Sequence, residues 1–273
     1  MSRFRVIQIS DCHLSREKSW FVPNFEAIAR VINAERPDLV VNTGDVALDG
    51  QNREDDLAFA RECHATLGVP CRAVPGNHDL GDNPPLRRPG EDITDERRAR
   101  YCRHFGEDHW LVDAGNWMLV GINAELLGSG LAAEDAQWSF LASAAAQAKT
   151  RPVALFVHKP LFNRDPAETE VNHRYVTPES RRRIRKTLGD ANVKLVASGH
   201  LHQHRRHRVG EIDYCWAPST AYVLSDRRQP VIGTKRVGYI DYTFDDTRVT
   251  VTIVEPPGVV THDLDDFPEA YGH

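Results

Sequence analysis

The chain has 273 residues, 41% of them apolar, which is enough to bury a substantial core in one large domain or two small ones. Its net charge of −5 gives no basic surface for nucleic acid, and no apolar run could span a bilayer, so neither partner is expected. Five cysteines without paired spacing and an N-terminus without a signal peptide predict a reduced, cytoplasmic protein.

Short apolar, β-branched runs alternate with helical patterns through the first 200 residues. Strands are predicted at Arg5–Ile9, Leu39–Asn42, Cys71–Val74, Trp117–Ile122, Val153–Val157 and Val193–Ala197. Helices are predicted at Asn24–Glu35, Glu54–Leu67, Glu134–Lys149 and Pro178–Leu188. This alternation is typical of α/β units with right-handed crossovers and buried parallel strands.

The pattern changes after His202, where short strand-like runs follow one another closely. They lie at Gln203–Val209, Glu211–Trp216, Gly238–Phe244 and Arg248–Val254, with turns at Gly210 and Asp245-Asp246. We expect them to form a second, more antiparallel sheet packed on the first. No repeat or low-complexity linker interrupts the chain, so residues 1–255 are predicted to form one domain. The acidic tail at 256–273 is expected to be a loose end or a partner-binding arm.

Two segments resist regular assignment. Gly81–Arg98 is rich in proline, glycine, arginine and acidic residues, and Phe162–Thr177 is mostly polar. Each follows a block of polar residues described below, so each either overhangs a site or is a solvated surface loop. Residues in segments that could approach such a site include Trp20, Asn24, His173, Arg174 and Tyr175.

Five short blocks of histidine, aspartate and asparagine follow the predicted strands, most of them directly. They read Asp11-Cys12-His13, Gly44-Asp45, Gly76-Asn77-His78-Asp79, His158 and Gly199-His200-Leu201-His202. The carboxyl ends of strands in open α/β sheets are where ligands and catalytic groups gather. Carboxylate and imidazole groups suit borderline divalent ions, and a carboxylate can bridge two of them. The blocks therefore predict a metal site with enough side chains for two ions.

Local spacing supports this prediction. Asp11 and His13 stand two residues apart, which places both side chains on one side of an extended segment and turns Cys12 away as a packing residue. His200 and His202 repeat that geometry.

Glycines and isolated histidines need separate interpretation. Gly44 permits a tight turn at a strand end, and Gly76 is expected to do the same. A single buried histidine is more often a hydrogen-bonded core residue than a ligand, but His158 directly follows a strand. His204 and His207 lie outside the pattern and are interpreted as surface or supporting residues.

In this order the blocks resemble the calcineurin-like metallophosphoesterases, whose pattern is D-x-H, G-D, G-N-H-D/E, a single H and G-H-x-H. The resemblance runs from Asp11 to His202, and all five blocks match. It implies an α/β fold, a four-layer αββα sandwich of two mixed sheets flanked by helices.

The resemblance also implies the roles of the site residues. The first metal ion would be held by Asp11, His13, Asp45 and His202. The second would share Asp45 and be completed by Asn77, His158 and His200. The catalytic pair would be His78, facing the substrate phosphate, and Asp79, which either orients His78 or is structural. The ligand types suit Mn, Fe, Zn or Co without deciding among them.

Subfamily features narrow the substrate. Leu48 stands where the iron–tyrosinate acid phosphatases carry tyrosine, and Asp79 stands where protein Ser/Thr phosphatases carry glutamate. Lys159-Pro160 and Ala217-Pro218-Ser219-Thr220 are similar to the class III cyclic nucleotide phosphodiesterases. We therefore expect hydrolysis of small-molecule phosphodiesters, with 3′,5′-cyclic nucleotides among them, by water activated at a dinuclear metal centre.

Three alternatives remain open. A phosphomonoesterase or a phosphonate-ester hydrolase of the same fold is the first alternative. A non-enzymatic binding module is disfavoured because every expected ligand position is filled. Nuclease action is disfavoured by the lack of a basic groove signature. The resemblance is also compatible with a homodimer.

Overall fold

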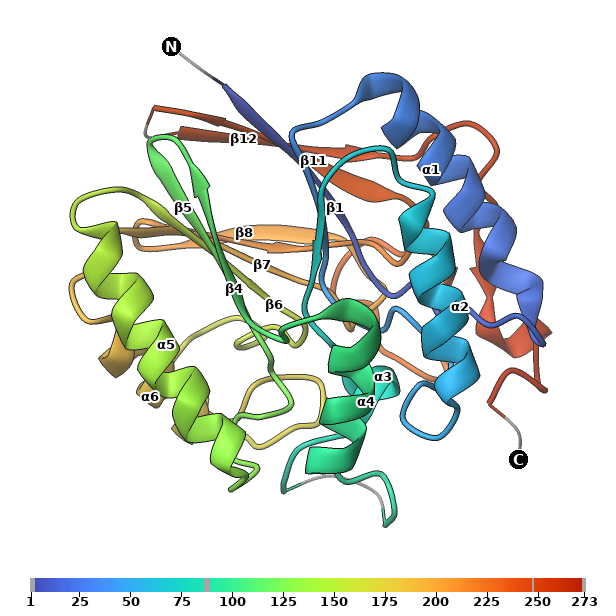
Figure 1. Cartoon of the computed structure of the whole chain (residues 1–273), viewed down its shortest axis with the longest axis horizontal. Coiled ribbons are helices and arrows are strands. Elements are labelled where there is room, and N and C mark those ends of the chain that lie inside the picture. The colour runs from blue at the N-terminus through green and yellow to red at the C-terminus, as the bar shows by residue number, and fades with distance from the viewer. Residues whose placement is uncertain (1–2, 86–88, 247, 272–273) are drawn as a thin grey trace.

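The computed structural model describes residues 3–85, 89–246 and 248–271. Two mixed sheets pack face to face, and helices cover the outer side of each (Figure 1). The predicted α/β sandwich of four layers is confirmed. None of the helices in the described part of the chain has the length and apolarity that crossing a bilayer requires.

The first sheet has the strand order β12-β11-β1-β2-β3. Its strands are β1 (Phe4–Ile9), β2 (Leu39–Asn42), β3 (Cys71–Ala73), β11 (Tyr239–Asp245) and β12 (Arg248–Val254). β1, β2 and β3 are parallel, whereas β11 runs antiparallel to β1. The helices that pack on it are α1 (Val22–Glu35), α2 (Glu54–Ala65) and α4 (Asp95–Phe105).

The second sheet has the order β4-β5-β6-β7-β9-β8. Its strands are β4 (Trp110–Ala114), β5 (Trp117–Ile122), β6 (Val153–Val157), β7 (Val193–Ser198), β8 (Arg205–Val209) and β9 (Ile212–Trp216). The outer helices are α5 (Ala132–Ala148) and α6 (Pro178–Leu188). β5, β6, β7 and β9 are parallel, and the edge strands β4 and β8 are antiparallel to their neighbours.

Strand alternation divides the apolar side chains among the layers. In β1, Ile7 packs toward the helices of the first sheet, whereas Val6 packs between the two sheets with Trp117 and Phe156. Leu155 of β6 packs toward α5 and α6. Because successive side chains of a strand point to opposite faces of the sheet, a continuous apolar run packs against the helices on one face and against the other sheet on the opposite face.

The late hairpins form as predicted, with turns at Gly210 and Asp245-Asp246, but they do not make a sheet of their own. One hairpin extends the first sheet beside β1, and the other extends the second sheet beside β7. The expectation of a separate antiparallel sheet is wrong in this respect. Each hairpin instead pairs the open edge of a parallel sheet, which would otherwise expose unpaired backbone groups.

Helix α4 and strand β4 are the longest of the elements that were missing from the sequence prediction. Helix α4 begins at Asp95, inside a segment expected to be irregular, and of its eleven residues only Tyr101 is buried. Strand β4 has two buried ends and an exposed or half-buried middle. Helix α4 has few apolar side chains among its charged residues, and β4 is short, so the apolar pattern on which sequence interpretation depends is weak in both.

The tail after residue 255 is folded onto the protein as far as the structure describes it, rather than being a loose end. Its β13 (His262–Asp263) pairs in parallel with β10 (Tyr222–Val223). Leu264 and Ala270 are buried in a small cluster with Phe21 and Tyr222.

Candidate metal centre

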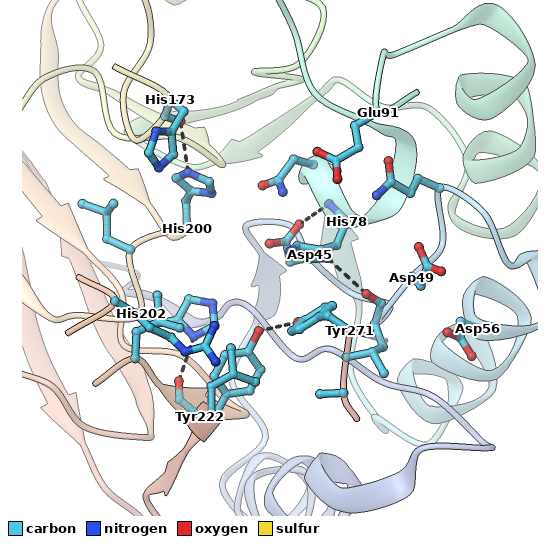
Figure 2. A pocket seen from close by; sticks show the side chains of 18 of the residues that line it. Asp45, Asp49, Asp56, His78, Glu91, His173, His200, His202, Tyr222 and Tyr271 are labelled. Atoms are coloured by element: carbon cyan, nitrogen blue, oxygen red, sulfur yellow. Dashed lines mark hydrogen bonds between the residues drawn. The ribbon is translucent and has the colours of Figure 1, made fainter. Parts of the chain in front are cut away.

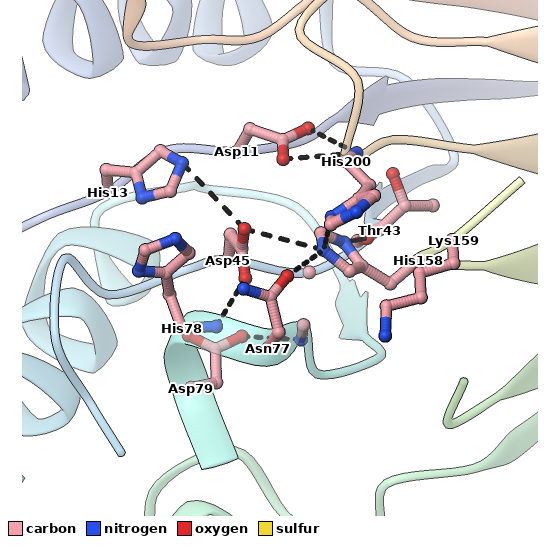
Figure 3. A network of polar contacts seen from close by, with 12 residues as sticks. Asp11, His13, Thr43, Asp45, Asn77, His78, Asp79, His158, Lys159 and His200 are labelled. Carbon is pink, nitrogen blue, oxygen red and sulfur yellow. Dashed lines mark hydrogen bonds and ion pairs between the residues drawn. The ribbon is translucent and has the colours of Figure 1, made fainter. Parts of the chain in front are cut away.

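The structure brings all nine predicted site residues into one cluster between the two sheets. Three blocks follow β1, β2 and β3 of the first sheet, and two follow β6 and β7 of the second. Asn77, His78 and Asp79 lie in the short helix α3 (Asn77–Leu80). Asp45 lies at the centre, with His13 on one side and His158 on the other (Figure 3).

The backbone of these blocks is strained. Positive φ angles of 44–68° occur at Asp11, His13, Asp45, His200 and His202. Non-glycine residues adopt this conformation at a cost of roughly 1–3 kcal/mol each, and such residues cluster at functional sites. The predicted extended geometry of the first block is therefore wrong, because Asp11 and His13 both adopt the left-handed conformation. The predicted outcome holds nonetheless, since both side chains face the site.

Cys12 points into the core behind the first block, as predicted. It packs with the apolar residues beneath α1, and its Sγ accepts a hydrogen bond from Asn42 Nδ2 at 3.3 Å. Burial raises the pKa of the Cys12 thiol. Cys12 is therefore a packing residue rather than a thiolate ligand.

Two glycines allow the blocks to approach each other. Gly44 has φ +102°, as the predicted tight turn requires, and a Cβ there would meet His158 Nδ1 at 2.5 Å. Gly76 has an ordinary φ of −112°, so the turn predicted for it is wrong. A Cβ at Gly76 would instead meet Asp45 Oδ1 at 2.2 Å. Gly76 is needed for close approach rather than for a turn.

Within this cluster, three groups of side chains have potential ligand atoms that lie within 4.8 Å of one another. They are Asp11 with His13 and His202, His13 with Asp45 and His78, and Asp45 with His158 and His200. Asp45 Oδ2 lies 3.9 Å from His13 Nε2 and 3.4 Å from His158 Nε2. One carboxylate thus links two neighbouring sets of ligands, which is the arrangement that a bridging ligand needs.

The histidine hydrogen bonds fit a pair of metal ions. His158 Nδ1 donates to the Thr43 carbonyl at 2.7 Å, and His200 Nε2 donates to the His173 carbonyl at 3.3 Å. Carbonyls only accept, so in the neutral rings the remaining nitrogens carry lone pairs. These nitrogens, His158 Nε2 and His200 Nδ1, face each other at 3.1 Å. Two facing lone pairs repel, so either a proton on one ring or a metal cation beside both rings would relieve the contact. Outer hydrogen bonds of this kind are typical of metal-bound histidines.

The same arrangement recurs on the other side of Asp45. His202 Nδ1 donates to the Tyr222 carbonyl at 2.8 Å, and His13 Nδ1 lies 2.9 Å from the Tyr271 hydroxyl. Their Nε2 atoms face each other at 3.2 Å. His202 Nε2 also lies 3.5 Å from Asp11 Oδ1.

The electrostatics of the cluster favour a bound cation. Burial lowers the pKa of His158, but the carboxylates of Asp45 and Asp11 raise it to about 10, because they attract positive charge to this point. Burial lowers the pKa of His13 and His200 well below the usual value, which keeps these rings neutral and able to bind metal. Burial tends to raise the pKa of Asp45, but the facing His158 and His78 lower it.

His78 and Asp79 have different surroundings. His78 Nδ1 lies 3.1 Å from the Leu48 carbonyl, which orients the ring. The Asp79 carboxylate accepts hydrogen bonds from the amides of Val46, Ala47 and Gly76 at 2.8–3.2 Å. Burial, followed by the nearby Asp45, raises the pKa of Asp79 to about 7. These contacts support the structural interpretation of Asp79 rather than a direct contact that orients His78.

A buried cluster of charged side chains surrounds Lys159, the residue that follows His158. The Lys159 ammonium contacts Asp82, and lies 2.7 Å from Asn83 Oδ1 and 2.8 Å from Glu125 Oε2. Burial lowers the pKa of Lys159, but Glu125 and Asp82 raise it. Lys159 therefore ties the end of β6 to the segments after α3 and β5.

A cavity of about 690 Å³ opens beside the cluster, and its lining includes Asp45, Asn77, His78, His200 and His202 (Figure 2). Both irregular segments reach it, which was one of the two alternatives for them, the first with Glu91 and the second with His173 and Arg174. Further residues line its rim, including Lys18, Asp49, Arg53, Asp56 and Arg228.

Sequence interpretation missed Tyr222 and Tyr271, which line this cavity and contact the cluster. Neither lies in a motif, so no local signal identifies them. Of the residues expected near the site, Tyr175 packs against Trp216, with ring centres 6.2 Å apart. Trp20 and Asn24 contact the C-terminal tail.

Comparison with known proteins agrees with this geometry. Residues 4–204 match the family described as calcineurin-like phosphoesterase. A probable glycerophosphodiester phosphodiesterase of Arcobacter nitrofigilis is 28% identical over 72% of this chain and 71% of its own length. A probable cyclic nucleotide phosphodiesterase of Psychrobacter arcticus is 27% identical over 80% of each chain.

The fold also matches a solved structure of a dimetal phosphatase from Danio rerio. The TM-score is 0.63 over 92% of this chain and 95% of that one, at 13% identity. The likeness to that structure concerns the fold alone. The family match, which covers most of the chain, and the clustered aspartate and histidine ligands lead to one conclusion: the chain belongs to the calcineurin-like phosphoesterase family and is a dimetal phosphoesterase.

Proposed function

We propose that the protein hydrolyses small-molecule phosphodiesters at two metal ions that share Asp45. One ion would be held by Asp11, His13, Asp45 and His202. The other would be held by Asp45, Asn77, His158 and His200. Manganese, iron, zinc and cobalt all suit these oxygen and nitrogen ligands.

The position of Asp45 is the observation that carries this proposal. Its Oδ2 lies within 4 Å of both His13 Nε2 and His158 Nε2, which come from opposite sheets. The backbone amide of His78 donates to Oδ1 at 2.8 Å and fixes the carboxylate between them. A shared carboxylate at this point would place two cations close together, as in-line displacement at phosphorus requires.

The residues around the cavity would have separate roles in metal binding, substrate contact and proton donation. A divalent pair bound here would supply Lewis-acid activation of water and neutralisation of the phosphoryl oxygens. His78, with Nδ1 held by Leu48, has Nε2 left for the substrate and, in its protonated form, would donate to the leaving oxygen. Asn77 would contribute an amide oxygen, which lies 3.2 Å from His158 Nε2.

The cavity and the relatives support a diester. A volume of about 690 Å³ has room for an organic group on each side of the phosphate. The relatives described above are named for glycerophosphodiesters and for cyclic nucleotides, which gives a panel of substrates to test. A homodimer stays a prediction.

The test compares bis(p-nitrophenyl) phosphate with p-nitrophenyl phosphate on protein loaded with Mn²⁺, followed by the panel of natural diesters. The proposal predicts faster hydrolysis of the diester and a loss of at least about a hundredfold in Asp45→Asn. Asp190→Asn, a surface carboxylate after α6, is the matched control. A clear preference for the monoester would contradict the diesterase proposal, and full activity in Asp45→Asn would contradict the shared carboxylate.

A further inference from the structure

The last described residue of the chain reaches the metal cluster. Tyr271 Oη lies 2.9 Å from His13 Nδ1 and also contacts the hydroxyl of Tyr222. Its ring centre lies 4.8 Å from that of His78. Figure 2 shows Tyr271 projecting into the cavity between Tyr222 and His78. The C-terminal segment therefore forms one wall of the site.

We propose that Tyr271 is a positioning residue for the phosphoesterase reaction, an inference that rests on the proposed function. Its hydroxyl fixes the tautomer and orientation of His13, and its ring closes the cavity beside His78. The site is thus completed by residues outside the family match, which ends at residue 204.

The hydrogen-bond directions follow from the role of His13. If His13 Nε2 is the ligand, Nδ1 carries the proton and donates to Tyr271 Oη. The Tyr271 proton is then directed to the Tyr222 hydroxyl. The Tyr222 carbonyl accepts from His202 Nδ1 at 2.8 Å. Two adjacent tyrosines therefore fix both histidines of the first ligand set, as outer hydrogen bonds do for metal-bound imidazoles.

The backbone segment that leads to Tyr271 is anchored by polar contacts. Lys18 Nζ donates to the carbonyls of Glu269 and Ala270 at 2.6 and 3.0 Å. Asn24 bonds both the amide and the carbonyl of Val260 at 2.8 Å.

Ion pairs and apolar packing add to these anchors. Asp265 pairs with Arg227 and Arg228 at 2.9 and 2.5 Å. Phe267 packs against Trp20 and Phe21, with ring centres 5.6 and 5.3 Å apart. Because these contacts fix the segment from Val260 to Ala270, they hold the hydroxyl of Tyr271 beside His13.

Tyr271→Phe is the decisive variant, because it removes the hydroxyl and keeps the ring. Mn²⁺ binding to metal-free protein is measured by titration calorimetry, and turnover is measured as a function of Mn²⁺ concentration. We expect one of two Mn²⁺ ions to bind about tenfold more weakly. Turnover at limiting Mn²⁺ should fall and recover in excess Mn²⁺, with KM for the diester changed less than about twofold. A purely structural role would not produce recovery by metal.

Tyr214→Phe is the matched control, since it removes a hydroxyl from β9 on the helix-covered face of the second sheet. Tyr271→Leu removes the aromatic ring as well as the hydroxyl, so it should raise KM for the diester in addition to weakening Mn²⁺ binding. Equal Mn²⁺ affinity in wild type, Tyr271→Phe and Tyr214→Phe would overturn the inference. Loss of turnover that excess Mn²⁺ does not restore would also overturn it. A wild-type protein that binds no Mn²⁺ would instead overturn the proposed function and this inference together.

Discussion

At the scale of single residues, a variant of His78 distinguishes a role in catalysis from a role in metal binding. His78 lines the cavity beside Asp45, and its Nδ1 is held by a backbone carbonyl. Because we place His78 outside the ligand set, His78→Gln should lower kcat by roughly 10²–10⁴-fold while two Mn²⁺ ions still bind. Steady-state kinetics and elemental analysis of the same sample check this.

The control for that experiment is His204→Gln, since His204 bonds the Trp216 carbonyl and lies outside the ligand groups. It should retain wild-type turnover. Loss of one Mn²⁺ ion in His78→Gln would show that His78 is a ligand, contrary to our assignment.

Asp79 should affect stability rather than chemistry. Its carboxylate accepts hydrogen bonds from three buried amides in the segments that follow β2 and β3. Removal of the acceptor in Asp79→Ala leaves these amides unpaired, at a cost of about 1–3 kcal/mol for each buried group. Urea denaturation of metal-free protein should show a loss of several kcal/mol. A loss below about 0.5 kcal/mol, the size expected at an ordinary surface position, would contradict the structural role.

At the scale of elements, the Lys159 cluster joins β6 to two loops of the chain. Lys159→Met leaves Glu125 and Asp82 facing each other with no ammonium between them. Breaking a buried ion pair from one side costs about 3–5 kcal/mol. Thermal unfolding of metal-free protein should show that loss.

Lys194→Met is the matched control, because its ion pair with Glu211 spans 3.6 Å at the surface. It should cost less than about 1 kcal/mol. If the two lysine variants lose the same stability, the buried cluster does not tie these elements together.

The elements also show what the sequence can predict. β1, β2, β6 and β7 were predicted because continuous apolar runs between polar blocks are typical of strands buried on both faces. The two late hairpins were predicted from their turns, but the sheets that they join were not predicted. The residues of a turn determine that its two flanking strands pair with each other. Which of the two open sheet edges the hairpin then joins depends on packing across the whole chain.

The same distinction applies to the site. The nine motif residues were predicted as one cluster because strand ends of an α/β sheet converge. Tyr271 was not predicted, because its contact with His13 spans 258 positions and its neighbours are typical of a loop. The left-handed conformations of Asp11 and His13 were missed as well, since no glycine marks them.

At the scale of the whole molecule, metal binding should stabilise the fold. The ligands come from both sheets, so bound ions would tie the two halves of the sandwich together. A ligand present at about 100 times its Kd adds about 2.7 kcal/mol. Saturating Mn²⁺ should therefore raise the melting temperature by roughly 5–10 °C, and a chelator should reverse the gain. An unchanged melting temperature would contradict binding between the sheets.

The claim on which the account depends is that two cations bind on either side of Asp45. The most direct test is an anomalous difference map from a crystal of the full chain soaked in Mn²⁺. We predict two peaks roughly 3.5–4 Å apart, one beside His13 and His202 and the other beside His158 and His200. A single peak, or peaks away from Asp45, would contradict the dinuclear centre proposed here.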